Sequence, residues 1–181
     1  MKTWIALLRG VNVGGARKLP MKDLVALLER AGFSSVRTYI QSGNVVFQSS
    51  KGTARALSTR IAELILKKFG FQSEVLVLSL RDLTEAIKGN PFPQADDDHK
   101  SLHLFFLSER PRDPDLKSLA TLKSGREAFA LVGAVFYLHT PDGFVDSKLA
   151  ARAERLLGVQ ATARNWRTVN QLLQLATPAS S

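Results

Sequence analysis

A basic, glycine-bearing stretch near the start of the chain has the residue types that bind an anion. Gly14 and Gly15 allow backbone N–H groups to approach a ligand closely, and Arg9, Arg17 and Lys18 add positive charge on either side. Phosphate is the ligand that such a combination fits best. The alternative interpretation is a tight connection between a strand and a helix, since glycines also serve that purpose.

The same stretch begins like a nucleotide-binding loop but does not continue as one. Gly10 and Gly15 are separated by four residues, as the first two glycines of a P-loop are. A P-loop then continues with Lys and Ser or Thr, whereas Ala16 and Arg17 follow here. We therefore predict anion binding without nucleotide hydrolysis.

Two further polar stretches are candidates for the same site. Gln41, Ser42 and Asn44 surround Gly43 in a sequence typical of a hairpin turn, and they could present polar groups to a ligand. Arg164 and Asn165 lie in a stretch that we expect to begin a helix, where they could hold a phosphate or a carboxylate. Ordinary turn formation and helix capping are the alternatives.

No pattern in the sequence indicates catalysis or metal binding. The chain has no cysteine and only three histidines, which are scattered at positions 99, 103 and 139. Neither a nucleophile-elbow motif nor a zinc-protease motif occurs. We expect no catalytic residue, no metal ligand and no cofactor.

The elements that position these groups follow a recognisable order in the first part of the chain. Hydrophobic periodicity predicts a strand over residues 3–9, a helix with Pro20 in its first turn, a hairpin about residues 41–44, a helix between Thr53 and Gly70, and a strand over 74–78. This order, β-α-β-β-α-β, is the ferredoxin-like pattern, which we assign to residues 1–78. Right-handed crossovers would bring the loop after the first strand to the hairpin. The side chains expected to converge there are Arg9, Asn12, Arg17, Lys18, Gln41, Ser42 and Asn44.

The rest of the chain predicts a linker and a second, smaller α+β subdomain. A capping sequence at Ser79 opens a linker helix, and helix and loop together occupy residues 79–100. Residues 101–181 form the second subdomain, with a strand over 102–107, a helix opened by Asp113 and Pro114, and a hairpin about Val132 and Gly133. Two helices complete the order β-α-β-β-α-α.

Charge and composition favour a polyanionic partner. The chain has 181 residues and a formal net charge of +9, which favours nucleic acids, nucleotides and acidic surfaces as partners. Its amino terminus lacks the long apolar run of a signal peptide, and no stretch is long enough to span a membrane. We expect a cytoplasmic protein without a membrane partner.

Three stretches together resemble the DUF1697 family of bacterial proteins. They are residues 6–15, residues 37–47 and residues 161–166. Asn90-Pro91-Phe92 and Ser147-Lys148-Leu149 are similar to family segments as well. The resemblance implies a ferredoxin-like part and a second α+β part, and it supplies no catalytic residues because the family has no established function.

These observations lead to one preferred function and two alternatives. We predict non-catalytic binding of a phosphate-bearing ligand, nucleic acid or a phosphorylated metabolite. The binding residues would be Arg9, Asn12, Gly14, Gly15, Lys18, Gln41, Ser42 and Asn44, with Arg164 and Asn165 from the second half. The first alternative is an enzyme that acts on a phosphorylated small molecule in a cleft between the subdomains. The second is a protein-interaction module, which could be a homodimer; the sequence does not determine the oligomeric state.

Overall fold

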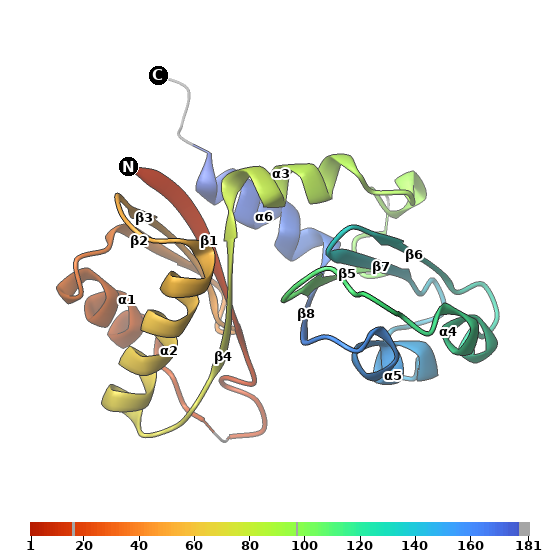
Figure 1. Ribbon diagram of the computed structural model, residues 1–181, viewed down its shortest axis with the longest axis horizontal. Helices are drawn as coiled ribbons and strands as arrows, with labels where there is room; N and C mark the ends of the chain where they lie inside the picture. The colour runs from red at the N-terminus through yellow and green to blue at the C-terminus, as the bar shows by residue number, and fades with distance from the viewer. Residues whose placement is uncertain (16, 97, 178–181) are drawn as a thin grey trace. The chain divides into compact units, whose positions relative to one another are not determined.

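The computed structural model describes residues 1–15, 17–96 and 98–177 of the chain. It has an α+β fold with two four-stranded sheets, in which every strand pairing is antiparallel. The chain divides into two compact units (Figure 1). Unit 1 comprises Met1–Glu85 and Asn170–Ser181, and unit 2 comprises Ala86–Val169. The predicted α+β class is confirmed.

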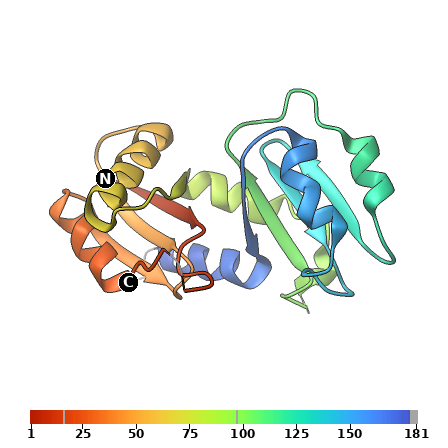
Figure 2. The same cartoon turned by 90° about the horizontal axis from the view of Figure 1, so that it is seen from below.

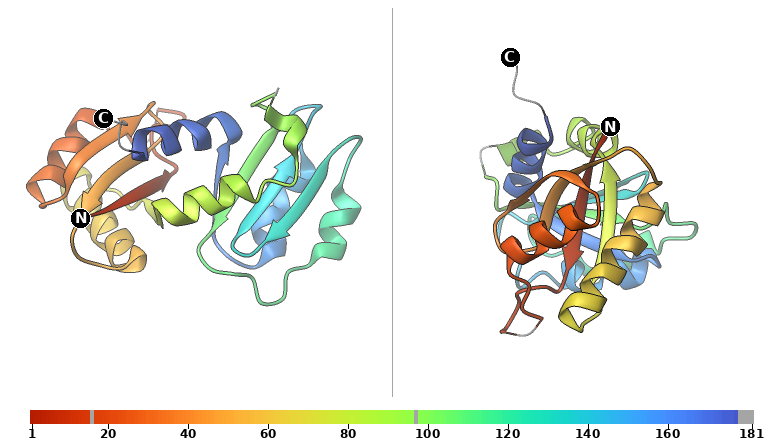
Figure 3. Two further views of the ribbon diagram at one scale, coloured as in Figure 1. Left: turned by 90° about the horizontal axis from the view of Figure 1, so that it is seen from above. Right: turned by 90° about the vertical axis from the view of Figure 1, so that its left-hand side faces the viewer.

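Unit 1 is built on the first four strands. Its sheet has the order β2-β3-β1-β4. The elements are β1 (Lys2–Arg9), α1 (Met21–Arg30), β2 (Ser34–Tyr39), β3 (Asn44–Ser49), α2 (Ala54–Phe69) and β4 (Glu74–Ser79). They follow one another in the predicted succession β-α-β-β-α-β. Both helices lie on one face of the sheet (Figures 1 and 3).

Alternation along β1 explains this layering. Trp4, Ala6 and Leu8 face the side of the sheet that packs on the helices, where they join one buried apolar cluster. Helix α2 contributes Ile61 and Ile65 to that cluster, four residues apart on one helix face. The two central strands are therefore anchored to the helices, and β1 ends at a fixed point from which the following loop emerges.

The helix limits of unit 1 follow from their end residues. Thr53 caps α2, accepting a hydrogen bond from the backbone N–H of Ala56, and Gly70 ends it in the left-handed conformation. Both limits agree with the sequence prediction. Pro20 differs slightly: it is the extended N-cap residue of α1, one position before the first helical turn. Its fixed φ suits either position.

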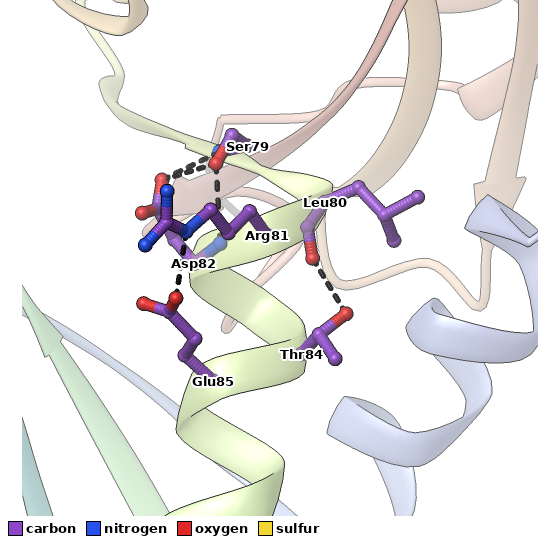
Figure 4. Close-up of polar contacts among 6 residues, drawn as sticks. All are labelled: Ser79, Leu80, Arg81, Asp82, Thr84 and Glu85. Atoms are coloured by element: carbon purple, nitrogen blue, oxygen red, sulfur yellow. Dashed lines mark hydrogen bonds and ion pairs between the residues drawn. The ribbon is translucent and has the colours of Figure 1, made fainter.

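The capping sequence at the start of α3 (Leu80–Lys88) forms as predicted. The backbone N–H of Ser79 donates to Asp82 Oδ2 at 2.9 Å, and the N–H of Asp82 donates to Ser79 Oγ at 3.1 Å (Figure 4). This reciprocal pair satisfies two N–H groups that the first turn leaves open. Strand β4 therefore passes directly into a helix, which runs from unit 1 into unit 2.

Unit 2 contains the second sheet, with the order β6-β7-β5-β8. Its elements are the short 3-10 helix η1 (Pro93–Asp96), β5 (Leu102–Leu107), α4 (Leu116–Leu122), β6 (Ala128–Val132), β7 (Val135–His139), α5 (Lys148–Leu157) and β8 (Ala161–Asn165), followed by α6 (Trp166–Ala176), which leads back into unit 1. Helices α4 and α5 lie on one face of this sheet (Figure 2). The outermost strands are β6 and β8.

Three sequence predictions for this unit are wrong. Residues 161–165, expected at the start of a helix, form strand β8, which pairs with β5 along its whole length. Sheet pairing here overrides the weak intrinsic strand preference of Ala, Arg and Asn. Helix α4 is capped by Asp115, not opened by Asp113 and Pro114, because the Asp115 carboxylate accepts from the N–H of Ser118 at 2.9 Å. The hairpin turn lies at Gly133–Ala134, one residue later than predicted.

The added strand changes the order of unit 2 to β-α-β-β-α-β. Its sheet places the second, third, first and fourth strands side by side, as the sheet of unit 1 does. The two units therefore share one topology. Among the helices of the described residues, none combines the length and the apolar composition that a membrane span requires.

Candidate functional site

The loop that leaves β1, residues 10–18, is the basic loop that the sequence singled out. Five of its residues have a left-handed backbone, namely Gly10, Asn12, Gly14, Gly15 and Arg17. Arg17 and Lys18 are exposed, and Val13 is 67% exposed. The loop thus combines exposed cations with a backbone that only glycine and a few other residues adopt readily. Ala16 lies outside the described residues.

Asn12 holds this loop in place. Its side-chain Oδ1 accepts from the backbone N–H of Leu19 at 2.8 Å, and its Nδ2 donates to the Leu19 carbonyl at 2.9 Å and to the Gln41 carbonyl at 2.7 Å. Both amide hydrogens and the oxygen are therefore engaged with backbone groups. Asn12, predicted as a ligand contact, closes the basic loop and attaches it to the β2–β3 hairpin.

The hairpin lies against the end of β1, as the topology predicted. The backbone N–H of Leu8 donates to the carbonyl of Gly43 at 2.8 Å. A Cβ placed on Gly43 would lie 2.6 Å from Leu8 Cβ and 2.8 Å from Val11 Cγ2. Only glycine fits this close approach, and its φ of +75° also favours glycine. Gly43 therefore fixes the distance between the hairpin and the basic loop.

The remaining hairpin residues divide into exposed and buried ones. Gln41 and Ser42 are exposed beside the basic loop, whereas Asn44 is fully buried. Asn44 Nδ2 donates to the Tyr39 carbonyl at 3.2 Å and to Ser42 Oγ at 2.9 Å. Asn44, predicted to contact a ligand, thus shapes the turn from inside. Ile40 completes the tip with a left-handed backbone and a side chain that is 53% exposed, a feature that no sequence pattern predicted.

Arg9 at the end of β1 is ion-paired. Its NH1 lies 3.1 Å from the Glu74 carboxylate on the adjacent strand β4, and both side chains are about half exposed (43% and 51%). The pair reduces the net charge at this corner of the basic loop. Lys18 and Arg17 therefore carry more of the positive potential than Arg9 does. The sequence predicted that Arg17 adds charge beside the glycines, although the predicted set of binding residues did not include it; its exposure beside Lys18 gives reason to include it.

Gly14 and Gly15 form the open side of the loop. A Cβ on either residue would meet no atom within 4 Å, so their backbone is accessible from solvent. The loop then leads directly into α1, whose N-cap residue, Pro20, makes no side-chain capping bond. The N-terminal N–H groups of a helix favour anions, although Asp23 in the first turn already supplies one negative charge.

The predicted residues of the second half lie in unit 2. Arg164, on β8, donates from NH1 to the Ala163 carbonyl at 2.8 Å, and burial lowers its pKa to about 10. Asn165 Oδ1 accepts from the backbone N–H of Thr168 at 2.9 Å and so caps α6. The alternative of helix capping is therefore correct for Asn165.

Unit 2 also contains a partly buried histidine that the sequence did not distinguish. His103 on β5 stacks on Phe144 with 3.6 Å between ring centroids, and burial lowers its pKa to about 4. No metal site accompanies it: over residues 1–15, 17–96 and 98–177, no three His, Asp or Glu side chains are close enough to hold an ion.

The positive charge is divided unequally between the units. The sequence of unit 1 contains 13 Lys and Arg residues against 6 Asp and Glu, a formal charge of +7. Unit 2 contains 12 against 10, a formal charge of +2. Most of the excess that suggested a polyanionic partner therefore belongs to the unit that carries the basic loop.

Comparisons with known proteins agree with this architecture. The sequence model of the family described as "Protein of unknown function (DUF1697)" matches residues 1–137. The structure is similar to that of the conserved bacterial protein SP0830 from Streptococcus pneumoniae, with a TM-score of 0.67 and 20% identity over 97% of this chain and 99% of that one. This likeness shows the fold alone. No curated protein matches the chain. Because the family match covers well over half of the sequence, the protein belongs to the DUF1697 family.

Proposed function

We propose that unit 1 binds a phosphate-bearing ligand through the basic loop, that nucleic acid is the preferred partner, and that binding involves no catalysis. The observation that carries the proposal is the exposure of Arg17 and Lys18 beside the unobstructed Gly14–Gly15 backbone. Cationic side chains and accessible backbone N–H groups together are the usual means of binding phosphate.

The anchoring of the basic loop at Asn12 and of the hairpin at Gly43 supports a binding role. Asn12 and Gly43 fix the two ends of the surface, so the exposed groups are held near one another before a ligand arrives. Less conformational entropy is then lost on binding. The charge of +7 in this unit favours a polymer of phosphates over a single phosphate, because a polymer can also interact with cations outside the loop.

The proposal assigns different roles to the predicted residues. The contact residues are Gly14, Gly15, Lys18, Gln41 and Ser42, to which we add Arg17. Arg9 also contributes positive charge to binding, but its ion pair with Glu74 offsets part of that charge. Asn12 and Asn44 position the loop and the turn. A contribution of Arg164 and Asn165 stays a prediction, as do the two alternatives, an enzyme acting on a phosphorylated molecule and a protein-interaction module.

The proposal includes two finer points of organisation. The strand order of unit 1 supports its assignment as ferredoxin-like. The division into residues 1–78, a linker over 79–100 and a second subdomain over 101–181 stays a prediction, and it differs from the compact units in that Asn170–Ser181 belongs to unit 1. The proposal also assumes a cytoplasmic location, where nucleic acids and phosphorylated metabolites are abundant.

The test is a binding titration with labelled single-stranded and duplex RNA and DNA at several salt concentrations. The double variant Arg17→Gln, Lys18→Gln should weaken binding at least about tenfold at low salt and flatten the plot of log affinity against log salt by about one to two units. The matched control is Lys51→Gln, Arg55→Gln, which removes the same charge beyond Ser49, at the end of the sheet where β1 begins.

Comparing the two double variants distinguishes a specific binding site at the basic loop from non-specific electrostatic attraction. Loss of affinity in the loop variant alone supports the proposal. Equal losses in both double variants would mean that only net charge matters, and would contradict it. If none of the nucleic acids binds at low salt, nucleic acid is excluded, and the same variants are then compared with the parent in a thermal-shift titration of phosphorylated metabolites.

A further inference from the structure

Strand β6 is the one outermost strand of the two described sheets that contains no charged residue. The other three outermost strands each carry at least one charge, including Arg37 on β2, Glu74 on β4 and Arg164 on β8. β6 consists of Ala-Phe-Ala-Leu-Val and contains no proline. Charges and prolines on outer strands prevent pairing with other chains. Their absence from β6 leaves this edge open to pairing.

The register of the β6–β7 hairpin determines which backbone groups face outward. Val132 and Val135 flank the two-residue turn, in which Gly133 has a φ of +60°, so they form a hydrogen-bonded pair. Hydrogen-bonded pairs alternate along an antiparallel ladder. The N–H and C=O groups of Phe129 and Leu131 therefore point away from β7.

The described structure provides no strand for those groups. In the sheet order β6-β7-β5-β8, β7 is the only described neighbour of β6, and Figure 1 shows β6 at the margin of the sheet. The side chains of Phe129 and Leu131 pack into the apolar cluster beneath the sheet, which holds the strand in place. The edge is thus a fixed template rather than a loose segment.

We propose that β6 pairs antiparallel with β6 of a second copy of this chain, about a two-fold axis at Ala130. In that register Phe129 lies opposite Leu131 of the second copy, and the reverse pair follows by symmetry. The two pairs would exchange about four backbone hydrogen bonds. Ala130 lies opposite its own counterpart in a close, non-hydrogen-bonded pair, where its small side chain allows the approach.

Charge favours a second copy as the partner at this edge. Two chains of charge +9 repel each other, but unit 2 contributes only +2 and β6 contributes none. The uncharged edge also has nothing that would select an acidic or basic peptide. Val132, which is 51% exposed at the end of the strand, adds apolar surface. Since a five-residue pairing buries much less area than a standard interface, we expect a weak dimer that depends on concentration.

Sedimentation equilibrium across a wide concentration range tests the proposal. The wild-type chain should associate reversibly. Ala130→Lys should weaken association at least about tenfold, because it places like charges directly opposite each other at the axis, and Ala130→Glu should do the same. An equimolar mixture of the two variants should regain association, because opposite charges then face each other. Val145→Lys, at a residue that is 93% exposed in a loop, is the matched control and should associate like the wild type.

Each outcome decides for or against β6 pairing. Association lost in both Ala130 variants and restored by mixing supports it, and thermal unfolding followed by circular dichroism verifies that both variants are folded. A wild-type chain that stays monomeric at the highest concentration overturns the proposal. So does a dimer that persists in both variants, since another surface must then form it. A variant that unfolds is replaced by Ala130→Arg or Ala130→Asp, which places a charge of the same sign at the axis, with the same interpretation.

Discussion

Asn12 Nδ2 lies 2.7 Å from the carbonyl oxygen of Gln41 and donates a hydrogen bond to it, joining two loops that are 29 residues apart in the sequence. Only the backbone of Gln41 takes part, whereas the whole amide of Asn12 is used. Substitution of the Asn12 side chain should therefore break this link between the loops, whereas substitution of the Gln41 side chain should leave it intact.

Replacing Asn12 with Ala should lower the free energy of unfolding by about 1–3 kcal/mol, because three hydrogen bonds to backbone groups are lost. Hydrogen exchange of the amides in residues 10–19 should become faster. Gln41→Ala is the control and should change stability by less than about 0.5 kcal/mol, since the carbonyl remains. Similar effects of the two substitutions in urea denaturation would contradict the assignment.

Gly43→Ala should be among the most destabilising single substitutions in unit 1. The new Cβ would lie 2.6 Å from Leu8 Cβ in a backbone with a φ of +75°. We expect a loss of about 2–4 kcal/mol from strain and overpacking together. Gly14 also has a left-handed backbone, but a Cβ there would meet no atom within 4 Å. Gly14→Ala should therefore lower the free energy of unfolding by only about 1 kcal/mol. Urea denaturation of both variants measures the difference, and equal losses would show that packing at Gly43 is unimportant.

Glu74→Gln should strengthen anion binding by releasing Arg9 from its ion pair. Because both side chains are about half exposed, the pair contributes less than about 1 kcal/mol to stability, and its loss should hardly change the melting temperature. Affinity for a labelled RNA at low salt should rise about two- to fivefold. Arg81 and Glu85 form a comparable exposed pair on α3, so Glu85→Gln controls for the added net charge. An equal gain there would show that Arg9 has no special part in binding.

His103 should make unit 2 less stable as the pH falls from about 6.5 to about 4. Burial lowers the pKa of His103 from 6.5 to about 4, so within this range the unfolded state binds a proton that the folded state does not. The free energy of unfolding should then decrease by up to about 1.4 kcal/mol per pH unit. Stability from this residue is fully present above pH 6.5.

His103→Phe tests the assignment while keeping a ring against Phe144. Urea denaturation at several pH values should show a smaller loss of stability in the variant between pH 6.5 and pH 4. The Nδ1 atom of His103 is buried and, among the described residues, has no hydrogen-bond partner, so removing it costs no contact. An unchanged pH profile would assign the acid sensitivity to other groups.

The elements that the sequence predicted well are those with local signals. Thr53 and Gly70 mark the ends of α2, and Ser79 and Asp82 mark the start of α3, because caps depend on residues three or four positions apart. Strand β8 was missed because its stability comes from pairing with β5, more than fifty residues earlier in the chain.

The candidate site likewise has features that residue types alone predict and features that depend on the folded chain. The exposed cations and glycines of the basic loop could be predicted because their chemistry is visible in the residue types. The positioning roles of Asn12 and Asn44 could not, because an asparagine that binds a ligand and one that binds the backbone have the same sequence signature. Their partners are determined only by the folded chain, through the position of Gln41 in one case and of Tyr39 in the other.

The common topology of the two units gives the basic loop a counterpart. Two halves with the same succession of elements and the same strand order are what duplication and fusion of one ancestral coding segment would leave. The position equivalent to residues 10–18 follows β5, where residues 108–114 contain Pro111 and Pro114, mixed charges and no glycine. After such a duplication, the first copy would have kept or acquired an anion-binding loop, whereas the second would have diverged into a rigid connection.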